Sequence, residues 1–174
     1  MRTVSVAIVT VLLLASPVAF ACSALGGFLP LAERLKEADA VFVAHLIATR
    51  EIRSADLDIP QAIKDEFDPE EANGPVIRGE FRLLETLKGQ VPATGHVYDL
   101  PLGPGNCSLG LMAGWDYVFV VPKPDEDMGD LWFVTWPTGS AGLGPYREQG
   151  DPDPEELASI RKLLDAAQPE QSQE

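Results

Sequence analysis

The sequence predicts an all-β fold, a small closed barrel of about five antiparallel strands with a helix before it and a helix after it. Two observations predict this class. Segments rich in Val, Ile and aromatic residues follow one another with Gly, Pro and Asn turn signals between them. Helical periodicity is confined to the two ends of that region. A closed barrel is expected because closure removes exposed sheet edges, and a length of 174 residues indicates one domain.

Residues 1–21 have the pattern of a secretory signal peptide. Arg2 is followed by an apolar run from Val4 to Ala15, and Ala19-Phe20-Ala21 supplies small residues at the −3 and −1 positions of a cleavage site. The run is too short for a permanent transmembrane helix, and no later segment is long or apolar enough. We therefore expect an exported protein, secreted or periplasmic, with no transmembrane segment.

Cleavage after Ala21 would leave Cys22 at the mature N-terminus. Two interpretations compete. Cys22 could be lipidated as in bacterial lipoproteins, but those usually carry Leu at −3 and a small residue at −2, where this chain has Ala19 and Phe20. The sequence therefore favours ordinary cleavage, which leaves Cys22 able to form a disulfide.

The chain has two cysteines, Cys22 and Cys107. Export places both in an oxidising compartment, where thiols tend to pair. A bridge would stabilise the folded state by about 4.6 kcal/mol in the chain-entropy model, because it lowers the conformational entropy of the unfolded chain. The alternatives are two free thiols, or a lipidated Cys22 with an unpaired Cys107.

The first predicted element is a short helix that opens at Pro30 and ends near Ala38-Asp39. Residues 53–75 are acidic and contain three prolines, so they indicate an insertion between strands, with one helical turn around Gln61–Phe67. Residues Pro124–Asp130 indicate a polar hairpin loop. Strands are predicted where β-branched and aromatic residues gather: Ala40–Ile52, Gly79–Leu87, Gly95–Leu102, Tyr117–Val121 and Leu131–Trp136.

The last predicted element is a helix that begins at Asp153. Asp153 can cap it, Pro154 suits the first helical position, and Glu156 completes a capping box. Before it, Gly139–Gly150 is expected to be irregular, with Gly142-Leu143-Gly144 in a turn. The predicted folded domain covers residues 22–168, and residues 169–174 are expected to form a disordered tail.

Several short motifs, in order, resemble the netrin-like, TIMP-like domain family. Ala38-Asp39-Ala40-Val41-Phe42-Val43-Ala44 is similar to the family's "ADAVFVG" strand, and Glu85-Thr86-Leu87-Lys88-Gly89 to its "KG" segment. Cys107-Ser108-Leu109 followed by Gly114-Trp115-Asp116-Tyr117-Val118-Phe119 resembles "CG…G-x-x-Y-L-V-F". The resemblance covers roughly Cys22 to Trp136.

This resemblance implies an OB-fold, a five-stranded Greek-key barrel with the C-terminal helix packed on it, and a Cys22–Cys107 bridge. In the tissue inhibitors of metalloproteinases, the amine and carbonyl of the N-terminal cysteine chelate the protease zinc, and the next side chain enters the specificity pocket. Cys22 and Ser23 hold those positions here. The chain departs from the family pattern at Ala24 and Ser108, which replace a Cys and a Gly.

Charge narrows the classes of partner. The chain has 27 acidic and 13 basic residues, a formal net charge of −14, and such a surface repels phosphate backbones. We therefore expect no nucleic-acid binding. The expected partner is a protein, and the resemblance implies a zinc metalloprotease.

Residues that could carry catalysis or metal binding are few. His45 and His96 are the only histidines and lie in no metal or nucleophile motif, and Ser108 misses the G-x-S-x-G spacing. Acidic groups at Asp56-Asp58 and at Asp125-Glu126-Asp127 with Asp130 fail the EF-hand pattern. Of three tryptophans, Trp136 beside Pro137 is expected to be exposed. The sequence thus predicts a binding module with no catalytic residues, no metal of its own and no cofactor. The alternatives are a lipid-anchored envelope protein or a secreted hydrolase.

Overall fold

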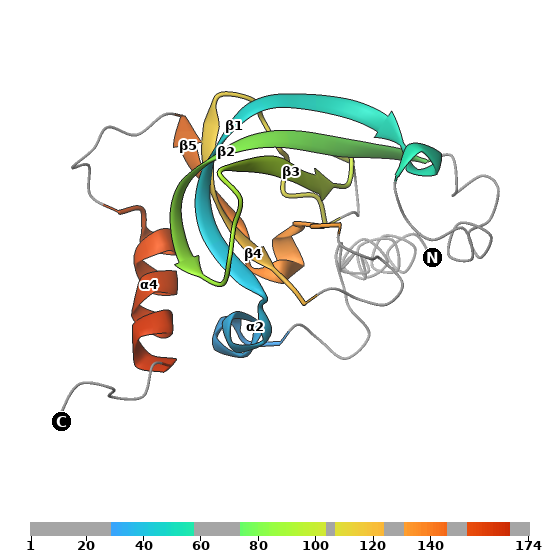
Figure 1. Cartoon of the computed structure of the whole chain (residues 1–174). Coiled ribbons are helices and arrows are strands. Elements are labelled where there is room, and N and C mark those ends of the chain that lie inside the picture. The colour runs from blue at the N-terminus through green and yellow to red at the C-terminus, as the bar shows by residue number, and fades with distance from the viewer. Residues whose placement is uncertain (1–28, 58–73, 104–106, 124–130, 146–152, 168–174) are drawn as a thin grey trace, which may run out of the picture.

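The fold is a five-stranded antiparallel sheet with two helices, one of them C-terminal (Figure 1), which confirms the predicted class. The computed structural model describes residues 29–57, 74–103, 107–123, 131–145 and 153–167. The strand order is β3-β2-β1-β4-β5. The elements are α2 (Leu31–Glu37), β1 (Ala40–Arg53), η1 (Ser54–Asp56), β2 (Pro75–Lys88), β3 (Thr94–Asp99), β4 (Trp115–Val121), η3 (Trp136–Thr138), β5 (Ala141–Pro145) and α4 (Glu155–Ala167).

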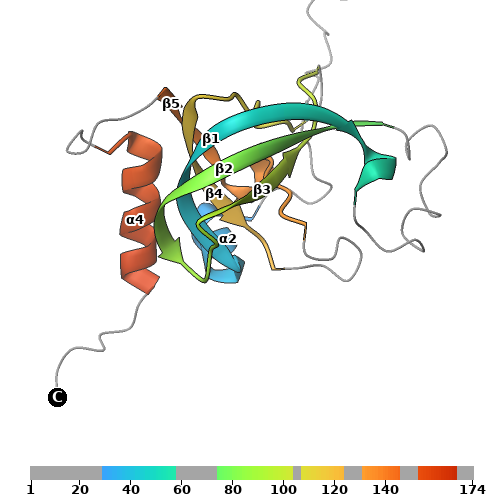
Figure 2. The same cartoon turned by 45° about the horizontal axis from the view of Figure 1, so that its top comes forward.

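The long strand β1 organises the sheet. Its first half, Ala40–His45, pairs with β4, and β2 pairs with it along almost its whole length. Three register shifts against β2 allow β1 to bend strongly, and Figure 2 shows β1 and β2 arching over the other strands.

The sheet is brought towards closure between β3 and the segment before β5. Tyr98 of β3 forms a parallel bridge with Phe133. Its amide donates to the Trp132 carbonyl oxygen at 2.9 Å, and its carbonyl oxygen accepts the Val134 amide at 2.8 Å. With the strand order, this bridge completes a five-stranded Greek-key barrel.

Alternating side chains divide the hydrophobic residues into an interior and an exterior cluster. The interior contains stacked or tilted aromatic rings, with Phe42 contacting Phe81, Phe119 and Trp132 at ring-centroid distances of 5.1 to 5.4 Å. Outside, both helices cover the valines of β1 and β4 with Leu35, Leu157 and Ile160. Packing of α4 against the barrel is therefore as the sequence predicted.

Several predicted boundaries differ from the structure. β2 begins at Pro75 rather than Gly79, and β3 ends at Asp99 rather than Leu102. In place of a strand over Leu131–Trp136 there is the single bridge at Phe133, followed by η3. The local pattern of apolar residues indicated that these segments form strands. It could not indicate where each strand ends, because a strand ends where its neighbour stops pairing with it.

The fifth strand lies where the sequence predicted irregular structure. β5 contains Gly142 and Gly144, which were expected to form a turn. Gly142 pairs with Tyr117 of β4, and a Cβ there would lie 3.4 Å from the Tyr117 ring, which is an ordinary contact distance. The pairing with β4 therefore makes this segment a strand.

Some predictions concern residues outside the described ranges. These are the signal peptide at 1–21, the Gln61–Phe67 turn with most of the 53–75 insertion, the 124–130 loop and the 169–174 tail. Among the described residues, no helix has the length and apolar character needed to cross a membrane.

Candidate functional site

The connection from β3 to β4 is built around one buried carboxylate, that of Asp99. It accepts the amides of Leu100 at 2.8 Å, Leu109 at 3.2 Å and Gly110 at 2.9 Å, and the hydroxyl of Ser108 at 3.0 Å. A single side chain at the end of β3 thus fixes both ends of the connection. We call residues 100–114 the β3–β4 loop.

Two opposing effects act on the Asp99 carboxyl. Burial raises its pKa, and the hydrogen bonds from Leu109, Ser108, Leu100 and Gly110 act in the other direction. The net direction is upward, so the ionised form depends on the loop keeping its donors in place.

Tyr117 holds the second half of the loop. Its hydroxyl accepts the Met112 amide at 2.9 Å and donates to the Gly110 carbonyl oxygen at 3.0 Å. Burial raises the pKa of this phenol, so it stays protonated and able to donate. Gly110 is therefore held on both sides, by Asp99 and by Tyr117.

This anchored loop exposes apolar side chains. Leu102 is 77% exposed, and Leu100 and Met112 are also exposed. A cavity of about 340 Å³ lies between the loop and the outer ends of β1 and β2, lined in part by Thr49, Ile77, Leu102 and Gly110. Contiguous exposed apolar side chains are a feature of surfaces that contact a partner, and Leu100, Leu102 and Met112 all belong to this loop.

Cys107 is part of the same loop. It is half-buried, and its carbonyl oxygen accepts the amide of Trp136, which is 58% exposed as the sequence predicted. The described residues include no free cysteine. Cys22 and Ser23 lie outside the described ranges, so the Cys22–Cys107 bridge and the zinc-chelating N-terminus stay predictions.

Ser108 has a structural place in this loop. Besides donating to Asp99, its oxygen accepts the Gly110 amide at 3.1 Å. Its proton is directed to a carboxylate rather than to an imidazole base, which differs from the arrangement of a serine nucleophile.

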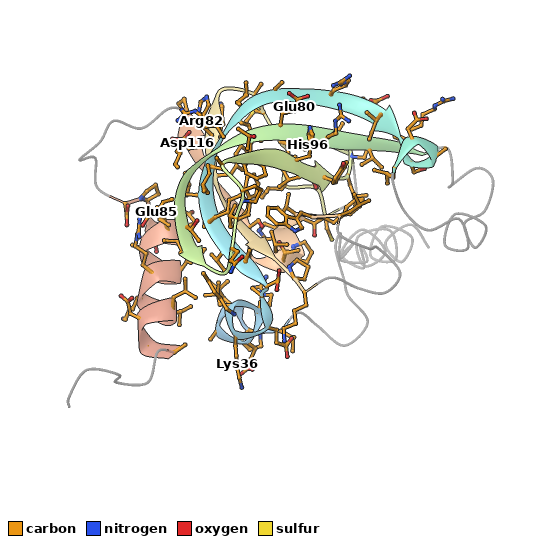
Figure 3. All side chains as sticks on the ribbon, in the orientation of Figure 1. Lys36, Glu80, Arg82, Glu85, His96 and Asp116 are labelled. Carbon is orange, nitrogen blue, oxygen red and sulfur yellow. The ribbon has the colours of Figure 1, made fainter. Side chains whose placement is uncertain are left out.

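The two histidines lie on different strands. His45 on β1 contacts Asp116 on β4, with 2.7 Å between Nδ1 and Oδ1, and Asp116 is 2% exposed. Arg82 of β2 lies in register with His45 on the opposite side of β1 from Asp116. His96 is exposed on β3 in register with Glu80, further along the sheet (Figure 3).

In the sequence, His45 belongs to no metal or nucleophile motif, and no local signal indicates Asp116 as its partner. Those two residues are 71 positions apart, and only the register of β1 against β4 brings them together. The sequence also gave no sign of Asp99 as the centre of the loop. Its position before a Pro- and Gly-rich stretch was the one available signal.

The described residues contain no group of three or more His, Cys, Asp or Glu side chains placed to hold a metal ion. Of the predicted acidic groups, Asp56 lies within this part of the chain and pairs with Arg53 at 3.3 Å. Asp58 and residues 125–130 lie outside it.

The fold and the loop define the class of molecule, a small β-barrel with an anchored, partly apolar loop beside a cysteine. Comparison with protein-family models and with curated protein sequences finds no match.

Proposed function

We propose that this chain is an exported, TIMP-like protein-binding module, secreted or periplasmic, that acts by binding and not by catalysis. Its binding edge is the β3–β4 loop together with the N-terminal segment that starts at Cys22. The observation that carries this proposal is the Asp99 carboxylate, whose four hydrogen bonds join Leu100 to residues 108–110 in the loop that exposes Leu102.

Preorganisation is what makes such a loop useful for binding. A loop that is already ordered loses less conformational entropy when a partner docks, so more of its contact energy becomes affinity. Leu102 is the natural anchor, because it is the most exposed large apolar side chain in the described residues.

The proposed partner class is a zinc metalloprotease. A Cys22–Cys107 bridge would hold the new N-terminus against the β3–β4 loop, since Cys107 is one of its residues. A neutral α-amine and the adjacent carbonyl oxygen can complete an open zinc coordination site. Ser23 would then be the side chain nearest the specificity pocket.

The test compares the mature protein beginning at Cys22 with a form carrying one additional alanine before it, against a panel of zinc endopeptidases. The native form is expected to inhibit and the extended form to lose inhibition, because the Cys22 nitrogen becomes an amide whose lone pair is delocalised into the carbonyl group and no longer binds zinc. Equal inhibition by both forms contradicts the zinc-chelating mechanism.

Loop binding is tested separately with Leu102→Asp, and Leu84→Asp on β2 serves as a matched exposed control. The loop variant should weaken the complex about tenfold or more, as expected for a hot-spot residue, and the control should not. Equal binding by both variants would remove the loop from the proposal.

The lipid-anchored alternative is separated by intact mass of the exported protein. The proposed form begins at Cys22 and loses two hydrogens when its thiols are oxidised. A diacylglyceryl-sized addition at Cys22 would instead establish an envelope anchor.

A further inference from the structure

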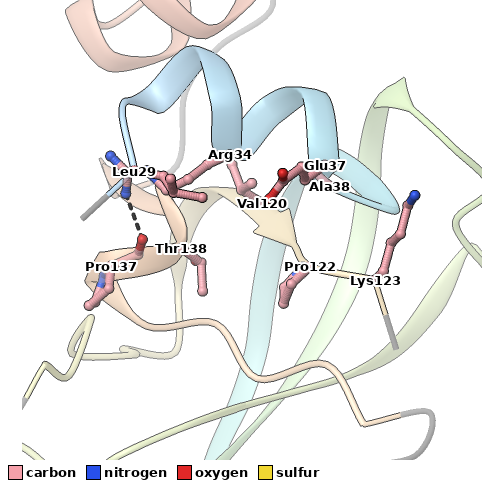
Figure 4. A pocket seen from close by; sticks show the side chains of 9 residues that line it. All are labelled: Leu29, Arg34, Glu37, Ala38, Val120, Pro122, Lys123, Pro137 and Thr138. Atoms are coloured by element: carbon pink, nitrogen blue, oxygen red, sulfur yellow. Dashed lines mark hydrogen bonds between the residues drawn. The ribbon is translucent and has the colours of Figure 1, made fainter. Parts of the chain in front are cut away.

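A second cavity lies away from the β3–β4 loop, between α2, the end of β4 and η3 (Figure 4). Its volume is about 560 Å³, within the range of small-molecule sites. Most of its lining is apolar, with Leu29 and Pro122 at the exposed rim and the buried Ala38 and Val120 beneath. We call it the α2 pocket.

Arg34 brings a cation to one end of the α2 pocket. Its Nη1 donates to the Pro137 carbonyl oxygen at 2.6 Å, and its buried Nε has no hydrogen-bond partner. A guanidinium has five N–H donors, and donors left unsatisfied beside apolar walls are costly. Nε is closed to solvent, so an anion at this end would pair with the terminal N–H groups of the guanidinium.

A second cation, Lys123, lines the opposite end of the pocket in Figure 4, with Glu37 between the two. The lining therefore carries two basic residues and one acid, whereas the whole chain carries 13 basic and 27 acidic residues. This local reversal of sign favours an anionic ligand over a cationic one.

The walls of the pocket are fixed before any ligand binds. The Arg34–Pro137 hydrogen bond ties α2 to η3. Gly139, at φ +98°, lets α2 approach closely, because a Cβ there would lie 2.8 Å from Leu31 Cδ1. A preformed pocket binds a small ligand with little ordering cost.

We propose that the α2 pocket binds a small amphiphilic carboxylate. The carboxylate pairs with the Arg34 guanidinium, and the apolar body lies over Ala38 and Val120 towards Pro122. Bidentate pairing with a carboxylate is the geometry that a guanidinium fork favours. The site is separate from the β3–β4 loop, so this proposal does not depend on the proposed function.

The test titrates decanoate, below its micelle concentration, into the mature protein. Binding is followed by two-dimensional amide NMR and by the fluorescence of Trp136, which is in η3 beside the pocket wall. Saturable shifts are expected at Leu29, Ala38, Val120 and Thr138. Decyltrimethylammonium and decanol, which match the chain but not the charge, should bind at least about tenfold more weakly, because a charge-assisted hydrogen bond is lost.

Two variants locate the carboxylate. Arg34→Met should weaken decanoate binding about tenfold or more. Leu29→Asp adds a carboxylate at the exposed rim, where folding tolerates it, and should weaken binding similarly, whereas the control Leu84→Asp should not. The proposal is overturned if both pocket variants bind decanoate as the native protein does, if decanol binds equally well, or if the shifts lie elsewhere.

Discussion

Ser108 donates its hydroxyl hydrogen to the Asp99 carboxylate across 3.0 Å, and the Gly110 amide donates to both side chains. A strand end is thereby linked to a loop nine residues further along the chain. The stability and shape of the proposed binding edge should therefore depend on this one carboxylate.

Replacing Asp99 with Asn should lower the free energy of unfolding by about 1–3 kcal/mol, because the amide nitrogen would face backbone donors that need an acceptor. Urea denaturation measures the loss. Asp56→Asn, at an exposed carboxylate paired with Arg53, is the control and should change stability by about 0.5 kcal/mol or less. Equal effects would show that Asp99 is not the centre of the loop.

The pH dependence of the same variant has a definite sign. Because burial raises the pKa of Asp99 in the folded state, its contribution is fully present below the unfolded pKa and is lost as pH rises through the folded value. The stability difference between native protein and Asp99→Asn should therefore shrink as pH rises from about 4 towards neutrality. A difference that grows over that interval contradicts the assignment.

Tyr117→Phe should lower the free energy of unfolding by about 1–2 kcal/mol, because the Met112 amide and the Gly110 carbonyl lose their hydrogen-bond partner. Amide hydrogen exchange at Met112 should accelerate. Burial raises the pKa of Tyr117, so the folded state resists ionisation of the phenol. The native protein should therefore lose stability above about pH 10, and the Phe variant should lose less. Unchanged exchange at Met112 would contradict this role.

Glu85→Gln tests how α4 is held on the barrel. Arg161 donates to Glu85 at 2.8 and 2.6 Å and to Asp153 at 2.7 Å, and the hydrogen bond from Arg161 lowers the pKa of Glu85. The contribution of the Glu85 carboxylate to stability is present above its pKa in the unfolded chain and is lost as pH falls through its pKa in the folded state. These side chains are partly exposed, so the variant should lose about 1 kcal/mol or less of its free energy of unfolding, and this loss should become smaller as the salt concentration rises. Thermal unfolding at several salt concentrations measures it, and salt-independent destabilisation would contradict an ionic role.

Two glycines with positive φ offer a matched pair. Gly89→Ala would place a Cβ on the Asp39 carbonyl oxygen, whereas a Cβ on Gly114 would meet nothing within 4 Å. The Gly114 variant should lose about 1–2 kcal/mol from backbone strain alone, and the Gly89 variant clearly more. Equal losses in denaturant unfolding would show that the close approach of Gly89 to Asp39 is not maintained in solution.

Local chemistry explains which elements the sequence predicted. The run Ala40–Ile52 predicted β1 because its residues favour a pleated, buried strand, and the Asp153-Pro154 start predicted α4. β5 was missed because its Gly142 and Gly144 carry no strand propensity of their own. It is a strand because it pairs with residues 115–118 of β4.

The sequence by itself determined the class of fold, strands β1 to β4 in outline and the terminal helices, because hydrophobic periodicity and capping are properties of neighbouring residues. Only the tertiary structure decided that Asp99 accepts hydrogen bonds from the β3–β4 loop, that Asp116 contacts His45, and that Arg34 lines an apolar pocket. Those contacts join residues distant in the chain. Strand register and helix packing set them, and no local pattern encodes either one.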